Sequence, residues 1–90
     1  MGNKLQVAVA GCGYWGKNHI RNFYQLGYLA GICDVKKEAV AAVIKDYPVT
    51  VYTWDEILSH KDIHAVIIVT PHQHHKRMAI EALNQGKHVF

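Results

Sequence analysis

The chain has 90 residues, half of them hydrophobic and 19% charged, which is the composition of one folded domain and not of a disordered tail. Its net charge of +3 comes from lysines and arginines scattered along the chain without a basic run, which argues against nucleic-acid binding. No apolar run approaches the ~20 residues that a membrane-spanning helix needs, and the N-terminus fits neither a signal peptide nor a myristoylation site. We therefore expect a cytoplasmic protein without a membrane partner.

Strand and helix patterns alternate from the start of the chain. The apolar run Leu5–Ala10 predicts a buried strand, and glycines follow it at once. A helical pattern covers Tyr14–Leu26 and ends at Gly27, where a left-handed cap is expected. A second apolar run, Tyr28–Cys33, predicts the next strand, which ends at Asp34.

The alternation continues with a second helix and a third strand. Val40, Val43 and Ile44 have the spacing of the inner stripe of a helix, and this helix must stop before Pro48. A short strand is expected immediately afterwards, over Val49–Tyr52.

A capping box marks the next helix. Thr53-Trp54-Asp55-Glu56 has the spacing of such a box, so a brief helix begins there with Ile57 and Leu58 turned inward. Five consecutive apolar residues, Ala65–Val69, then predict the central strand. The last two expected elements are a helix over Gln73–Gln85 that ends at Gly86, and a fifth strand that starts in Lys87–Phe90.

This alternation predicts an α/β fold, a Rossmann-like, doubly wound parallel sheet in one domain, 1–90. About five strands are expected in the order 3-2-1-4-5, with a switch point between strands one and four. Such a sheet normally has a sixth strand, so it is expected to be incomplete at its C-terminal edge. Ligands of these sheets bind beyond the carboxyl ends of the strands, where Gly11–Gly16 and Thr70-Pro71-His72 would converge.

The glycine loop Gly11-Cys12-Gly13-Tyr14-Trp15-Gly16 follows the first strand and opens the first helix, which is the context of a dinucleotide-binding loop. Gly11 permits a tight turn, Gly13 lets a pyrophosphate approach the backbone, and Gly16 lets the helix pack closely on the sheet. Free amides at the start of that helix would then face the phosphate charge. The helix stripe expected to face the sheet is Gly16, Ile20, Phe23 and Gly27.

Asp34 stands at the end of the second strand, where a carboxylate can accept the adenosine ribose hydroxyls and would repel a 2′-phosphate. This favours NAD over NADP as the cofactor, although Lys36 and Lys37 could soften the preference. Two alternatives remain open: an ordinary strand-to-helix turn with Asp34 as a helix cap, and a methyltransferase-like site. The second usually has an acidic residue leading into the glycines, where this chain has Val9-Ala10.

Two cysteines, Cys12 and Cys33, are too few for a disulfide scaffold. They are expected as free thiols, although a bridge between neighbouring strands under oxidation is conceivable. Cys12 stands at a helix N-terminus, which can lower a thiol pKa and make it reactive. The alternative, which we favour, is that Cys12 is a small residue filling a crowded turn.

His72, His74 and His75 form a cluster, but a stable zinc site needs three or four ligands, and no second cluster accompanies them. No metal site is therefore expected. Helical phase separates the three: His72 lies in the loop, and His74 shares a face with Met78. The inward stripe expected for this helix is His75, Ala79, Ala82, Leu83 and Gly86.

Several segments, in order and spacing, make the whole chain resemble one family of oxidoreductases. They are Ala8–Phe23, Cys33-Asp34, Ala65–Pro71, His75 and Ala82–Phe90. The family is that of glucose-fructose oxidoreductase, inositol dehydrogenase and the rhizopine catabolism protein (Gfo/Idh/MocA). Its members hold NAD(P) in this domain and a sugar, nucleotide sugar or cyclitol in a separate C-terminal α+β domain.

The resemblance implies roles for individual residues. Tyr14 and Trp15 would contact the pyrophosphate, and Thr70, Pro71 and His72 would line the nicotinamide side. His75 matches the histidine that follows the Thr-Pro loop. The Gly-Tyr-Trp-Gly form looks most like that of members acting on nucleotide sugars.

Two departures from the family pattern bear on activity. His64 stands where an aspartate is common, and the family's catalytic lysine belongs to a Glu-Lys-Pro motif beyond Phe90. The 90 residues are therefore expected to be a fragment of a larger two-domain enzyme that contains no catalytic residue and is inactive alone. The alternative is a non-catalytic, nucleotide-sensing module that self-assembles into a homo-oligomer through its sheet edge.

Overall fold

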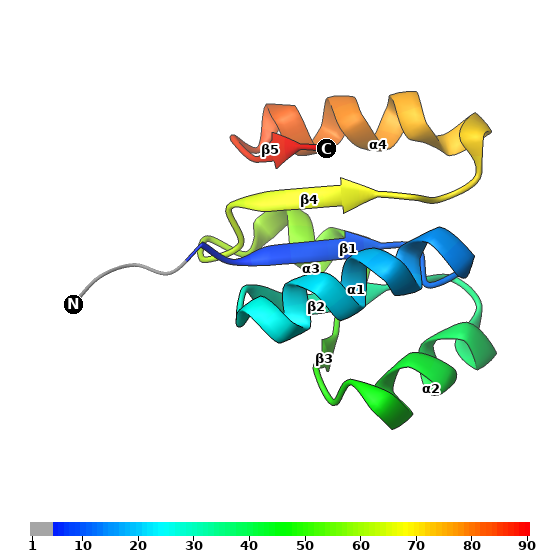
Figure 1. Ribbon diagram of the computed structural model, residues 1–90. Coiled ribbons are helices and arrows are strands. Elements are labelled where there is room, and N and C mark those ends of the chain that lie inside the picture. The colour runs from blue at the N-terminus through cyan, green and yellow to red at the C-terminus, as the bar shows by residue number, and fades with distance from the viewer. Residues whose placement is uncertain (1–4) are drawn as a thin grey trace.

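The computed structural model describes residues 5–90 as one five-stranded parallel sheet flanked by four helices (Figure 1). Residues 1–4, which carry part of the expectations about the N-terminus, lie outside the described residues. The strand order is β3-β2-β1-β4-β5, which confirms the predicted α/β class and topology. The strands are β1 Val7–Ala10, β2 Leu29–Cys33, β3 Thr50–Val51, β4 Ala65–Ile68 and β5 His88–Val89. The helices are α1 Tyr14–Leu26, α2 Lys37–Asp46, α3 Trp54–Ser59 and α4 His72–Asn84.

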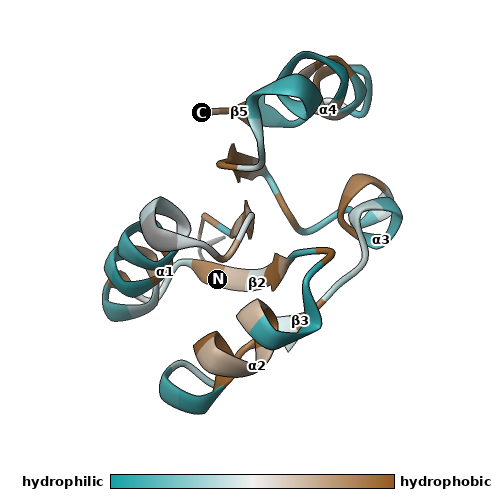
Figure 2. Ribbon diagram, turned by 90° about the vertical axis from the view of Figure 1, so that its right-hand side faces the viewer, coloured by the Kyte–Doolittle hydropathy of each residue, from teal (hydrophilic) through white to brown (hydrophobic). Residues whose placement is uncertain are grey.

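The helices form two layers, with α1 and α2 on one face of the sheet and α3 and α4 on the other (Figure 2). Strand β1 lies at the centre and is buried on both faces. Val7 and Val9 pack in the cluster with Ile20 of α1, whereas Ala8 and Ala10 pack in the opposite cluster, that of Ile57 and Met78. This alternation is the period of two that a strand imposes on its side chains.

The predicted helix signals are confirmed where they depend on local geometry. Gly27 ends α1 in the left-handed conformation, with φ 79°, and its N–H reaches the carbonyls of Phe23 and Tyr24. The capping box opens α3: the Glu56 N–H donates to Thr53 Oγ1 at 3.1 Å, and the Thr53 N–H donates to Glu56 Oε1 at 2.8 Å. These bonds satisfy two of the amides that a helix start leaves unpaired.

The predicted faces of two helices need correction. Ile44 of α2 is 38% exposed, and Leu83 of α4 is 59% exposed, although both were expected to face inward. Met78, expected with His74 on a different face from the inward stripe, is instead buried. The inward stripe of α4 is His75, Met78, Ala79 and Ala82, because the helix is rotated so that Met78 packs against the α3 side of the sheet.

Several boundaries also differ from prediction. β1 begins at Val7 and not at Leu5, and α4 begins at His72, one residue earlier than expected, with Pro71 as its N-cap. β5 contributes two residues to the sheet, His88 and Val89.

Helices α3 and α4 are joined by side chains across their shared layer. The Trp54 indole Nε1 donates to Glu81 Oε1 at 2.9 Å, and Arg77 forms an ion pair with the same oxygen at 3.2 Å. The indole bond is half-buried, so it fixes the two helices more firmly than the exposed ion pair does.

Lys87 is a buried lysine that composition and periodicity did not reveal. Its Nζ donates to the carbonyl oxygens of His60 at 2.8 Å and of Ile63 at 2.9 Å. The ammonium group therefore lies against the carboxyl end of α3, where a helix carries partial negative charge. Burial lowers the pKa of Lys87 from its ordinary value. The side chain ties the start of β5 to the connection between α3 and β4.

Replacing this lysine tests the tie. Lys87→Met leaves two buried carbonyls without their donor and should lower the free energy of unfolding by about 1–3 kcal/mol in urea titrations. Lys61→Met, at an exposed lysine in the same connection, is the matched control and should lie close to the parent chain. Equal stabilities for the two variants would show that the Lys87 bonds contribute nothing net.

Candidate functional site

Three loops meet at one edge of the sheet, beyond the carboxyl ends of β1, β2 and β4. Because β1 lies between β2 and β4, the glycine loop lies between Asp34 and Thr70-Pro71-His72 (Figure 1). The Gly11 N–H donates to the Cys33 carbonyl at 2.8 Å, and the Val69 N–H donates to the Ala10 carbonyl at 2.9 Å. The predicted juxtaposition of these loops is therefore present at the switch point of the sheet.

Gly11 and Gly16 are needed for close main-chain packing. Gly11 has φ +112°, and a Cβ there would lie 2.9 Å from the main chain of Val69. A Cβ on Gly16 would overlap the carbonyl oxygen of Gly11 and would also approach the Val69 side chain. A side chain at position 16 would therefore push α1 away from the sheet, as the spacing predicted.

Gly13 has a different environment, because a Cβ there would meet nothing within 4 Å. It is the exposed N-cap of α1, and the first turn of the helix carries no acidic residue. The positive end of the helix dipole is thus left open to solvent next to a residue without a side chain. This arrangement suits an anion approaching along the helix axis.

Asp34 bonds directly to the glycine loop. Its Oδ2 accepts the Cys12 N–H at 2.7 Å, and its Oδ1 accepts the Lys36 N–H at 2.9 Å. The carboxylate is half-buried, and it is the only acidic group that these contacts bring to the described part of the loop. Sequence reasoning placed Asp34 at the site but did not foresee these two main-chain bonds.

The two cysteines are buried and free, and Cys12 Sγ lies 3.9 Å from the Cys33 carbonyl oxygen. Burial, and then the Asp34 charge, raise the pKa of Cys12 to about 11. Burial, and then the neighbouring Cys12 and Asp34, raise the pKa of Cys33 to about 12. Burial thus opposes formation of a Cys12 thiolate, which favours the alternative that Cys12 is a small residue filling a crowded turn.

The loop after β4 is fixed through Thr70, whose hydroxyl donates to Met78 Sδ at 3.3 Å. Pro71 and His72 are exposed, and the rings of His72 and His75 lie 6.0 Å apart. The Nε2 atom of His75 is buried without a hydrogen-bond partner in the described structure. A buried nitrogen without a partner is unusual, and it can form a hydrogen bond with a ligand or with another part of a protein.

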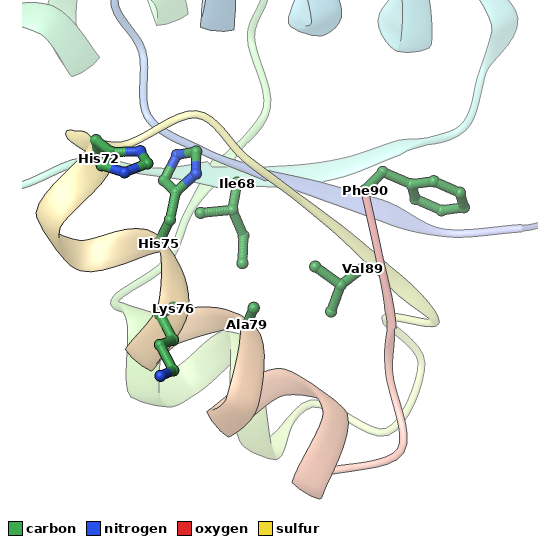
Figure 3. Close-up of a pocket in the computed structure, with 7 residues that line it drawn as sticks. All are labelled: Ile68, His72, His75, Lys76, Ala79, Val89 and Phe90. Carbon is green, nitrogen blue, oxygen red and sulfur yellow. The ribbon is translucent and has the colours of Figure 1, made fainter.

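A hollow of about 430 Å³ lies beside His75, between α4 and the ends of β4 and β5 (Figure 3). Ile68, Val89 and Phe90 form its apolar side, and His72 stands at its rim. His74, which clustered with these histidines in sequence, is exposed on another face of α4. Within residues 5–90 no group of three His, Cys, Asp or Glu side chains could hold a metal ion.

The two aromatic residues of the glycine loop, Tyr14 and Trp15, lie in the first turn of α1. Trp15 is 68% exposed. The Tyr14 main chain begins the helix, but its side chain lies outside the described part of the structure. Among residues 5–90, every helix falls short of the length and apolar character that a membrane span requires.

Comparison with known proteins matches nearly the whole chain. Residues 5–90 match an oxidoreductase family described by its NAD-binding Rossmann fold. A protein of Shewanella putrefaciens named as a glycosyl hydrolase family 109 protein is 38% identical to this chain. The match covers 96% of this chain and 22% of the relative.

Solved structures share the fold. UDP-N-acetylglucosamine 3-dehydrogenase from Acidithiobacillus ferrooxidans aligns with a TM-score of 0.85 at 29% identity, over 96% of this chain and 27% of that one. Myo-inositol dehydrogenase from Lactobacillus casei, in complex with NAD(H) and myo-inositol, aligns with a TM-score of 0.85 at 27% identity, over 97% and 27%. The chain thus spans about a quarter of the length of these proteins.

The unequal surroundings of the glycines can be measured. Gly16→Ala should destabilise the fold by about 1–3 kcal/mol despite the better helix propensity of alanine, because the new Cβ meets main-chain atoms. Gly13→Ala, the matched control, should change stability by less than about 0.5 kcal/mol, because a stiffer unfolded chain offsets a weaker N-cap. Denaturant unfolding of both variants tests the comparison, and equal losses would contradict it.

The raised thiol pKa values predict instability in alkali. Above pH 9.0, the ordinary thiol value, the unfolded chain loses protons that the native state keeps until about 11 at Cys12 and about 12 at Cys33. Stability should therefore fall as the pH rises, by about 1 kcal/mol per thiol at about pH 10. The double variant Cys12→Ala/Cys33→Ala should show a shallower fall than the parent chain between about pH 8 and about pH 10. If the stabilities of the two chains fall in parallel as the pH rises, the thiols are not the cause of the loss.

Proposed function

The chain belongs to the Gfo/Idh/MocA oxidoreductase family, and from this premise we propose that it binds NAD at the glycine loop, as the cofactor-binding domain of a dehydrogenase. The observation that carries the proposal is the open N-terminus of α1 at Gly13, with the Asp34 carboxylate beside it. A ligand with a diphosphate next to a ribose matches that order of groups.

The described residues fit the cofactor at each step. The space over Gly13 admits the pyrophosphate, and the helix amides and dipole oppose its charge. Asp34 accepts the adenosine ribose hydroxyls with lone pairs that its two amide bonds leave available. Three further members of the loop flank the pyrophosphate: Cys12, Tyr14 and Trp15.

The other end of the cofactor points toward the loop after β4. Thr70, Pro71 and His72 border the nicotinamide, and the unpartnered Nε2 of His75 is available for a further hydrogen bond in that region. NAD, when bound, supplies the carbon that accepts or gives a hydride. The residues of this chain hold and orient that group, and no described residue is assigned the proton transfer.

NAD is preferred over NADP because of charge. A 2′-phosphate would approach the Asp34 carboxylate, which is fixed in place by two main-chain amides. The neighbouring Lys36 and Lys37 are exposed and can offset only part of that repulsion, because solvent screens them.

Substrate binding is proposed to lie outside these 90 residues. The relatives are about four times as long, since the chain covers 22% to 27% of their lengths. We place the domain at 1–90 and assign a sugar, nucleotide sugar or cyclitol to a separate domain, so that the 90 residues alone bind cofactor without turnover. The buried free thiols favour a cytoplasmic location.

A second reaction class has its own support, because the relative from Shewanella putrefaciens is named as a glycosyl hydrolase. The two classes differ in redox balance. A dehydrogenase accumulates NADH in proportion to oxidised product, whereas a hydrolase releases free sugar with no net NADH.

Calorimetry with NAD and NADP tests the binding proposal. NAD should bind at least about tenfold more tightly than NADP, as expected from one charge repulsion. Gly13→Val should weaken NAD binding by at least about tenfold while the melting temperature stays near that of the parent, because its side chain enters the space assigned to the pyrophosphate. Lack of NAD binding by the parent chain, or unchanged affinity in Gly13→Val, would overturn the proposal.

A further inference from the structure

Both oxygens of the Asp34 carboxylate accept hydrogen bonds from main-chain amides. Oδ2 accepts the Cys12 N–H at 2.7 Å across a separation of 22 residues, and Oδ1 accepts the Lys36 N–H at 2.9 Å. Hydrogen bonds to a charged acceptor are about twice as strong as neutral ones. One side chain therefore holds two loops at once.

The bond to Cys12 lies just beyond the end of the ladder between β1 and β2. The last paired residues are Ala10 and Cys33, and the Gly11 N–H then donates to the Cys33 carbonyl at 2.8 Å. One residue further along, the Cys12 N–H donates to the Asp34 side chain and not to a main-chain carbonyl. The carboxylate thus sets the direction of the chain immediately before Gly13.

The bond to Lys36 closes the turn that leads into α2. Lys36 is the N-cap of that helix but makes no side-chain capping bond, and Val35, at the tip, is 95% exposed. Packing therefore does little to fix this turn. Its geometry depends on the Asp34 carboxylate and on the helix that follows.

We infer that Asp34 is a positioning residue for the glycine loop, in addition to the ribose ligand of the proposed function on which this inference rests. The carboxylate orients the Gly11–Cys12 peptide, and with it the chain that leads into α1. Such preorganisation removes an ordering cost from binding. The carboxylate cannot swing aside for a 2′-phosphate without releasing the amides of both Cys12 and Lys36.

This role has a consequence for cofactor specificity. If Asp34 only repelled the 2′-phosphate, Asp34→Ala would gain affinity for NADP while losing affinity for NAD. Because the same substitution frees the glycine loop, Asp34→Ala weakens the binding of both dinucleotides. The loss extends to a ligand that makes no use of the ribose hydroxyls.

Amide hydrogen exchange of the ligand-free protein tests the positioning role directly. In Asp34→Ala the Cys12 amide should exchange at least about tenfold faster than in the parent chain, the change expected from losing one charge-assisted bond. Asp34→Asn, which keeps one acceptor oxygen, should lie between the two. Asp46→Asn removes the same charge from an exposed position at the end of α2 and is the control. The Val66 amide of the central sheet reports global unfolding, and an unchanged ratio of Cys12 to Val66 exchange in Asp34→Ala would overturn the inference.

Binding to a modified cofactor separates positioning from ribose recognition. The probe is NAD whose adenosine ribose lacks both hydroxyls. A residue that acts only on the ribose leaves the affinity for this analogue equal in the parent and Asp34→Ala chains, which would overturn the inference. The positioning role predicts at least about a fivefold loss for the analogue, together with no gain for NADP. If the parent chain binds no NAD, the proposed function fails, and the exchange ratio still decides the positioning role.

Discussion

The direct contact between the main chains of Gly11 and Gly16, with no side chain between them, is the constraint on which the rest of the site depends. It lets α1 begin almost on top of β1, so the open end of the helix lies over the carboxyl edge of the sheet. The central position of β1 then brings Asp34 to one side of that end and the loop after β4 to the other. Both neighbours are hydrogen-bonded to this region: Asp34 accepts the Cys12 N–H, and the Val69 N–H donates to the Ala10 carbonyl. The geometry of the anion-facing surface thus follows from the absence of two Cβ atoms.

Local patterns in the sequence were sufficient to predict the end of α1 at Gly27 and the capping box at Thr53, because both depend on neighbouring residues. The strand order followed from the alternation of strands and helices, which is typical of one sheet topology. Helix faces were harder. The phase of α4 admits several inward stripes, and tertiary packing of Met78 selects one that leaves Leu83 in solvent. Long-range bonds were invisible for the same reason: the Lys87 ammonium meets carbonyls about twenty-five residues away in the chain. At the site, residue types and spacing indicated which groups converge, but not that Asp34 would already be bonded to two amides.

The comparisons place proteins with different names on one shared domain. A named glycosyl hydrolase and two named dehydrogenases all align with this chain over about a quarter of their lengths. A common fold of this kind accounts for a common ligand-holding surface and leaves the chemistry to residues elsewhere.

The two tryptophans of the chain stand in unlike surroundings, and this makes the molecule its own spectroscopic reporter. Trp15 is 68% exposed in the first turn of α1, whereas the Trp54 indole is half-buried and bonded to Glu81 between α3 and α4. Indole emission shifts to shorter wavelengths when water is excluded from the ring. The red part of the emission therefore originates beside the glycine loop, and the blue part originates in the contact between two helices on the opposite face. Events at the loop and loosening of the fold can be followed separately in one unlabelled sample.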